Sequence, residues 1–114
     1  MSDLPIPSIG RIVHYTLSES DADAINRRRT DAVMYRANPH NPERVALKPT
    51  GFQQHTGNQV SSGDVFPMVI VRVWGTKPDS VVNGKVLLDG NDDLWVTSVG
   101  QGEGERRWVW PPRV

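Results

Sequence analysis

The chain has 114 residues, no cysteine, and 13 basic against 13 acidic residues, which gives a formal net charge of zero. This length fits one domain with a single core, and the balanced charge argues against binding to nucleic acid or an anionic membrane, because both depend on summed positive charge. The lack of cysteine excludes a disulfide framework. Because the chain has neither a leader-like start nor an apolar run of about 20 residues, we expect a soluble intracellular protein.

The first expected elements are a strand and a helix. Residues 10–17 form a β-branched and aromatic run, which favours a strand. Ser18 and Asp21 follow with the spacing of a helix-starting capping box, with Asp in place of the usual Glu or Gln, so we expect a helix over residues 19–37. The residues that recur near helical spacing and define its core-facing stripe are Ala22, Ile25, Arg29, Ala32 and Tyr35.

A long loop and a long strand are expected next. Residues 38–63 carry little apolar content and no periodicity, which predicts a surface loop. Residues 65–74 alternate between two faces and predict a strand. Because Val69, Val71 and Val73 share one of these faces, we expect that face to lie in the core.

The C-terminal part of the chain predicts three further strands. Asn83-Gly84 is typical of a turn, here leading into a strand over residues 85–88. Residues 89–93 are typical of the hairpin turn to a strand over residues 94–99. Residues 106–110 predict the last strand, which ends at a pair of prolines.

These elements together predict a mainly β fold. Five short strands, with one helix inserted after the first and a long loop, fit a small SH3-like barrel, because closing a short sheet on itself removes its exposed edges. An OB-like barrel also has five strands and stays open as the alternative. We expect residues 1–114 to form a single domain, with the barrel strands that follow the loop over residues 65–110.

No motif for chemistry is complete. The polar turn at residues 89–93 begins like a calcium loop, but Leu94 stands where a glycine is needed and Gly100 where a bidentate glutamate is needed. The histidines lack zinc-ligand spacing, and no serine has the glycine-flanked setting of a nucleophile. We therefore expect a protein that is not an enzyme and that uses no metal and no cofactor.

Tryptophan and arginine are the candidates for binding. Four tryptophans exceed what so small a core is expected to hold, and tryptophan with arginine dominates binding hot spots and stacks on flat groups such as nucleobases. The alternative is that two indoles fill the core and the others cap its open ends. Arg29 lies on the core-facing stripe and must pair with a carboxylate, a carbonyl or a ligand phosphate, so it is the first candidate for an anion contact. The candidate ligand-binding residues are Arg29, Asn58, Arg72, Trp74, Trp95, Thr97, Ser98, Arg107 and Trp108.

Several segments of the chain bear a family resemblance. They are residues 7–17, Gly57-Asn58, residues 63–74, residues 86–92 with Trp95 and Thr97-Ser98, and Trp110-Pro111. Together they resemble a group of small uncharacterised bacteriophage proteins, notably those of actinobacteriophages, over nearly the whole chain outside residues 38–56. The resemblance implies a phage-encoded protein that works in the host cytoplasm, and it assigns no site residue.

Three functions stay open at this point. The first is a counter-defence protein that sequesters a nucleotide-derived immune signal in a pocket lined by tryptophan and arginine. The second is an inhibitor or adaptor that docks on a host protein through an exposed apolar patch. The third is a minor structural or decoration protein of the virion. Surplus tryptophan and strand edges lead us to expect a homo-oligomer in each case, with no membrane and no nucleic-acid partner.

Overall fold

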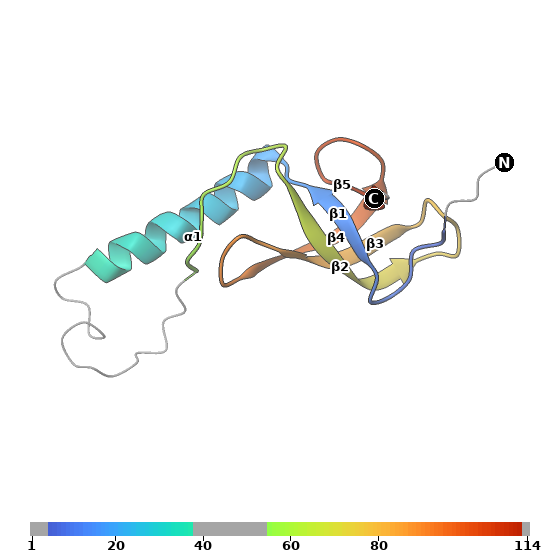
Figure 1. Cartoon of the computed structure of the whole chain (residues 1–114), viewed down its shortest axis with the longest axis horizontal. Coiled ribbons are helices and arrows are strands. Elements are labelled where there is room, and N and C mark those ends of the chain that lie inside the picture. Colours follow the sequence, from blue (N-terminus) through green and yellow to red (C-terminus); the bar gives the residue numbers. More distant parts are fainter. Residues whose placement is uncertain (1–4, 38–54, 113–114) are drawn as a thin grey trace.

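The computed structural model describes residues 5–37 and 55–112 of the chain, and Figure 1 shows a small barrel with one helix running away from it. The expected loop over residues 38–63 can therefore be compared only over residues 55–63, where an isolated bridge between Gly57 and Gly90 is the one strand-like pairing. The elements in chain order are β1 (Ile12–Thr16), α1 (Glu19–Ala37), β2 (Val65–Trp74), β3 (Val81–Leu87), β4 (Asp93–Gln101) and β5 (Arg107–Val109).

The five strands form a closed barrel in which each strand pairs with the next one in the sequence. All pairs are antiparallel except β4 with β5, which are parallel and meet at only two register pairs, Gly100 with Arg107 and Gln101 with Trp108. This confirms the mainly β barrel with an inserted helix. The consecutive order agrees with an SH3-like barrel and differs from the Greek-key order of an OB-fold.

The core fills the barrel and extends under the first turns of the helix. Its largest fully buried side chains are Trp108, Tyr15 and Leu17, and α1 contributes Ile25. The other residues of this cluster are Val13, Met68, Ile70, Val82, Val86, Val96 and Val99 from the strands, Val60 and Leu88 from connecting segments, and Ala22 from the helix. Burial of these apolar side chains is the main stabilising contribution to the fold.

The prediction that the β2 face with Val69, Val71 and Val73 lies in the core is wrong. Met68 and Ile70 are fully buried, whereas Val71 is 42% exposed. A β-bulge lies between Ile70 and Arg72, so Val71 is an extra residue that has no partner on β3. The bulge reverses the alternation, and for this reason Val73 packs against the core.

Asn83-Gly84 does not form the expected turn, because β3 runs straight through it from Val81 to Leu87. A Cβ on Gly84 would lie 2.5 Å from Met68 Cγ and 2.9 Å from the carbonyl oxygen of Val69. Glycine is needed here for close packing of neighbouring strands at a bend in the barrel, since the bulge of β2 stands beside it.

The start of the helix confirms the capping box. The Asp21 N–H donates to Ser18 Oγ at 3.0 Å, and the Ser18 N–H donates to Asp21 Oδ2 at 3.1 Å. The Tyr15 hydroxyl donates to the same carboxylate oxygen at 2.5 Å, which ties the cap to β1. Burial, and then this hydrogen bond, raise the pKa of Tyr15 well above its usual value.

The core-facing stripe of α1 is confirmed at Ala22, Ile25, Arg29 and Ala32, which are all buried. Asn26 fixes the returning chain by donating from Nδ2 to the Val60 carbonyl at 2.8 Å and accepting the Val60 N–H at 2.8 Å. Within the described residues, no helix has the length and apolar character needed to cross a membrane.

Candidate binding surface

Several candidate residues gather on the outward face of β2, β3 and β4. The register places Arg72 beside Asn83, Trp74 beside Val81, and Trp95 beside Lys85. Side chains that face each other across paired strands project to the same side of the sheet. We call this surface the outer strip and define it as Arg72, Trp74, Asn83, Lys85, Trp95, Thr97 and Ser98.

One end of the outer strip is organised around Trp74. The guanidinium carbon of Arg72 lies 3.8 Å from the centroid of the Trp74 ring, which is a cation–π contact. The indole Nε1–H of Trp74 donates to Asn83 Oδ1 at 3.1 Å. Because Trp74 still exposes 47% of its surface, this ring is held in place while one part of it faces solvent.

Asn83 also organises the neighbouring part of β4. Its Oδ1 accepts the backbone N–H of Ser98 at 2.8 Å, and Ser98 has a φ of 52°, which non-glycine residues rarely adopt. The register moves from Val82 with Val99 to Gly84 with Val96, so β4 has one extra residue opposite Asn83. The Asn83 side chain therefore stabilises the bulge of β4 and the position of Trp74 at the same time.

The other end of the outer strip is Trp95, which is 63% exposed. The strand register pairs Trp95 with Lys85 on β3, Lys85 with Val69 on β2, and Val69 with Ile12 on β1. Ile12 is 51% exposed, so an apolar row broken only by Lys85 crosses the outside of four strands. An exposed face with this composition is typical of an interaction surface.

The charge of the outer strip is positive and is not balanced within it. Arg72 and Lys85 are its charged side chains, and neither forms an ion pair with a carboxylate in the part of the chain that the structure describes. The nearest acidic residue along β4 is Asp93, which stands beyond Trp95 and faces Leu87.

Two other candidates lie elsewhere in the barrel. Trp108 is completely buried, so its expected ligand contact is wrong and it belongs to the core. It meets Trp110 edge to face, with ring centroids 5.5 Å apart, and Trp110 packs against the core beneath Arg11. Two indoles therefore belong to the core, as one interpretation of the sequence expected, whereas Trp74 and Trp95 lie on the outer face. Arg107 is exposed at the start of β5, where its Nη1 donates to the Gln101 carbonyl at 3.4 Å.

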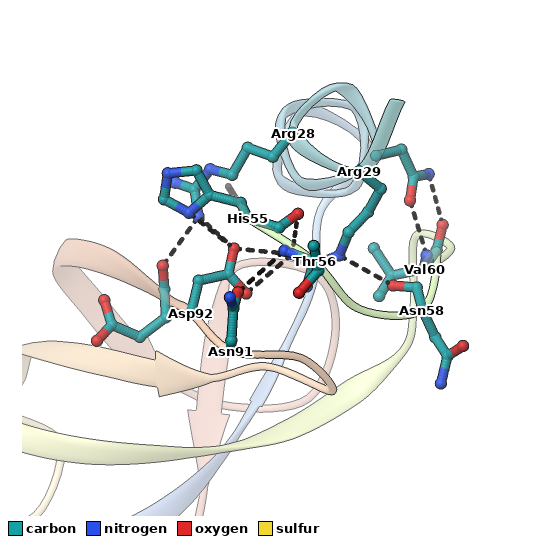
Figure 2. Close-up of polar contacts among 10 residues, drawn as sticks. Arg28, Arg29, His55, Thr56, Asn58, Val60, Asn91 and Asp92 are labelled. Carbon is teal, nitrogen blue, oxygen red and sulfur yellow. Dashed lines mark hydrogen bonds and ion pairs between the residues drawn. The ribbon is translucent and has the colours of Figure 1, made fainter. Parts of the chain in front are cut away.

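Arg29 lies in a polar cluster between the helix and the β3–β4 hairpin (Figure 2). Its Nη1 donates to Asp92 Oδ1 at 2.9 Å and to Oδ2 at 2.8 Å, and both side chains are only 3% exposed. Backbone carbonyls of His55 and Asn58 accept further hydrogen bonds from its Nη1 and Nε, at 3.2 and 3.3 Å. The expected anion contact of Arg29 is thus made with a carboxylate of the same chain.

Two more nitrogen-bearing side chains lie close to Asp92 in this Arg29–Asp92 cluster. Arg28 Nη1 lies 3.3 Å from Asp92 Oδ2, and His55 Nδ1 lies 3.3 Å from the same oxygen. A Cβ on Gly57 would lie 3.0 Å from Arg29 Cζ, and one on Gly90 would lie 2.8 Å from Arg29 Nη2. The glycine bridge therefore leaves just enough space for the guanidinium group.

Polar residues around the cluster tie the returning chain to the hairpin. Asn58 donates from its backbone to the Asp89 carbonyl at 3.0 Å and from Nδ2 to Asp89 Oδ2 at 2.8 Å. Thr56 and Asn91 exchange two hydrogen bonds, each of 2.9 Å. The candidate Asn58 accordingly has a structural partner, and the cluster as a whole holds α1 against the barrel.

Sequence reasoning did not identify Asn83, Lys85 and Asp92 as members of these sites. Asn83 belongs to an expected turn, and Asp92 belongs to the expected hairpin turn over residues 89–93 and to the incomplete calcium loop. A buried arginine signals that a carboxylate must lie nearby, but the partner of Arg29 is 63 residues away in the sequence. No local pattern identifies which of the acidic residues that partner is.

Two hollows of the described structure lie beside α1, and neither of them is lined by a residue of the outer strip. One, of about 250 Å³, lies beside Arg29 and is lined by Thr30, Val33, Met34 and Thr56, with Gly57 and Gln59. The other is an open hollow of about 520 Å³ along the first turns of α1. Among the described residues, no group of three or more His, Cys, Asp and Glu side chains is arranged to hold a metal ion.

Comparison of the chain with protein-family models, with curated proteins and with solved structures gives no match. The interpretation of the outer strip and of the Arg29–Asp92 cluster therefore depends on their own geometry. In the cluster, Arg29 and Asp92 are buried and paired with each other, and among the described residues only Arg29 Nη2 of that pair has no hydrogen-bond partner. The outer strip is exposed and carries unbalanced charge, so the outer strip is the candidate binding surface.

Proposed function

We propose that this chain is a small protein-binding module that docks a partner protein on its outer strip. The observation that carries the proposal is the pair of exposed indoles, Trp74 at 47% and Trp95 at 63%, on one sheet face together with Arg72. Tryptophan and arginine are the residues most enriched in the energetic centres of protein interfaces. Exposure of two large indoles to water is unfavourable, so a partner that covers them gains binding free energy from their burial.

The geometry supports protein binding more than sequestration of a nucleotide-derived signal. Sequestration needs several phosphate donors around one pocket, and Arg29 and Arg107 lie outside the outer strip, with their own partners in the chain. Arg72 is the only candidate arginine beside an exposed indole. The two hollows contain no residue of the strip, whereas a protein partner needs no deep cavity.

The resemblance to small phage proteins leads us to propose a protein of the infected cell as the partner. In this proposal the chain acts in the host cytoplasm as an inhibitor or adaptor and catalyses no reaction. Self-association and a role in the virion stay predictions, because the same apolar row can also meet a second copy or a particle protein.

The proposal is tested by site-specific cross-linking in cells that produce the chain. Benzoylphenylalanine is placed at the position of Thr97, on the outer strip, and in a control protein at the position of Asp31, on the exposed side of α1. We expect a discrete cross-linked partner from the first position only. Trp74→Ala/Trp95→Ala should abolish partner capture, while Ile9→Ala/Met34→Ala, which removes two even more exposed apolar side chains elsewhere, should preserve it.

Equal capture of the partner by Trp74→Ala/Trp95→Ala and by Ile9→Ala/Met34→Ala would contradict the proposal. Native mass spectrometry of gently purified protein supplies a second criterion, because it reports subunit number and bound mass together. A bound mass of a few hundred daltons that is lost on substitution of Arg72 would support sequestration of a small molecule instead of protein docking. Retention of the partner by purified wild-type protein, lost in the Trp74→Ala/Trp95→Ala variant, would support docking.

A further inference from the structure

We infer that the occupant of the outer strip is an acidic, extended segment of the partner that carries an apolar side chain near each end. This inference rests on the proposed function and specifies the chemistry of its partner. It follows from three features of the strip: uncompensated positive charge between the two indoles, an arginine that is already held in position, and a distance between the indoles that matches a short peptide.

The first feature is the charge. Arg72 and Lys85 lie between the two indoles along the strip, and neither has a carboxylate partner among the described residues. In contrast, Arg28 and Arg29 share Asp92, and Arg106 approaches Asp21 at 3.8 Å. A partner without acidic groups would have to desolvate two cations with no compensation, whereas carboxylates would pair with both.

The second feature is the preorganisation of Arg72. Its guanidinium carbon lies over the Trp74 ring, 3.8 Å from the ring centroid, and the indole is held in turn by the hydrogen bond from Nε1 to Asn83. A stacked guanidinium keeps its edge donors free for bidentate contact with a carboxylate. Less side-chain entropy is lost on binding when the arginine is already held in one position.

The third feature is the length of the strip. Trp74 and Trp95 lie on strands two places apart, and their register positions on β3, Val81 and Lys85, are four residues apart. With ordinary strand spacing this corresponds to a diagonal of roughly 16 Å. An extended segment of about five residues has this length, so apolar side chains near its ends reach the indoles while acidic residues between them face Arg72 and Lys85.

The test uses an array of synthetic seven-residue peptides in which acidic, basic and apolar residues are equally represented at every position. Wild-type protein should retain acidic peptides with apolar residues near both ends. Arg72→Glu/Lys85→Glu should weaken that retention by about tenfold or more and shift the selection toward basic peptides. Lys77→Glu, which reverses an exposed lysine in the β2–β3 connection, should leave the selection unchanged.

Retention of neutral or basic peptides by the wild-type protein, or of no acidic peptide at all, would overturn this inference. An unchanged selection by Arg72→Glu/Lys85→Glu would also overturn it, provided that circular dichroism shows both proteins to be folded. If the protein bound a single-stranded oligothymidylate more tightly than any peptide, the occupant of the outer strip would be a nucleic acid and not an acidic segment of a protein. The proposed function fails separately, when Trp74→Ala/Trp95→Ala leaves the cross-linked partner unchanged.

Discussion

Arg29 and Asp92 form a buried ion pair, in which each side chain is only 3% exposed to solvent. The Coulomb attraction in such a pair is offset by the loss of hydration, so its net contribution is small, but removal of one partner leaves a buried charge without compensation. The pair therefore matters most for how α1 is positioned on the β3–β4 hairpin.

We predict that Arg29→Ala lowers the free energy of unfolding by about 3 kcal/mol, because Asp92 then stays buried with only the weaker contacts of Arg28 and His55. The double variant Arg29→Met/Asp92→Leu should lose less than the single variant. Urea denaturation of the wild type, of Arg29→Met and Asp92→Leu, and of the double variant measures the coupling. Additive losses would show that the two side chains do not act as a pair.

Tyr15 makes the stability depend on alkaline pH. Its pKa is raised above the unfolded value of 10.0, so the folded state keeps a proton that the unfolded chain releases. The stabilising contribution is complete below about pH 10 and is lost as the pH rises toward the folded-state pKa. We expect the free energy of unfolding to fall above pH 10, and to fall less steeply in Tyr15→Phe.

Urea denaturation at pH 8, 9, 10 and 11 measures this effect. Tyr15→Phe should also be less stable than the wild type at pH 8, because it loses the hydrogen bond to Asp21. Tyr35→Phe is the matched control for loss of a tyrosine hydroxyl. Identical alkaline slopes for Tyr15→Phe and the wild type would contradict the assignment.

At the scale of the element, β3 shows how the barrel bends. Gly84 lies against Met68 of β2, and a bulge stands on each side of β3, at Val71 in β2 and at Thr97-Ser98 in β4. Bulges increase local twist and allow a short sheet to close. The same bend brings Asn83 outward to the point where it meets both Trp74 and Ser98.

We predict that Gly84→Ala destabilises the protein by about 2 kcal/mol, because its Cβ would lie 2.5 Å from Met68 Cγ in a fully packed core. Shortening the neighbour in Gly84→Ala/Met68→Val should recover part of the loss relative to Met68→Val alone. Thermal and urea denaturation measure both effects. Equal stability of Gly84→Ala and wild type would show that both Met68 and the Val69 carbonyl can move aside without cost.

The helix is the element that local sequence describes best. Its capping box, its acidic first turn and its buried stripe all agree, and the helix spans Glu19–Ala37 as expected. Strand β2 likewise spans Val65–Trp74, yet its inward face differs from the expected one because one bulge changes the alternation. Element bounds follow from local patterns, whereas the direction of side chains follows from pairing with a second strand.

At the scale of the whole molecule, the four tryptophans divide into two classes. Trp108 is completely buried and Trp110 packs on the core, whereas Trp74 and Trp95 are exposed on the outer strip. Indoles of both classes contribute to fluorescence, so the exposed pair can report on its surroundings within the intact protein.

We predict that acrylamide quenches two populations of tryptophan fluorescence in the wild-type protein. Trp74→Phe/Trp95→Phe should remove most of the accessible population and leave emission from a buried environment, since Trp108 has no exposed surface. A partner or peptide that docks on the outer strip should protect the accessible population. Quenching of the double variant as strong as that of the wild type would contradict the placement of these indoles.

The sequence by itself determined the elements that depend on short-range interactions: the capped helix, the β-branched strands, the polar hairpin turn after β3 and the mainly β class of the fold. It also determined that a buried arginine on the stripe needs a partner. Only the tertiary structure decided that this partner is Asp92, that Asn83-Gly84 lies within a strand, and that Trp74 and Trp95 face outward while Trp108 faces inward. The physical reason is that ion pairs, bulges and close packing depend on contacts between residues far apart in the chain, and no local pattern contains them.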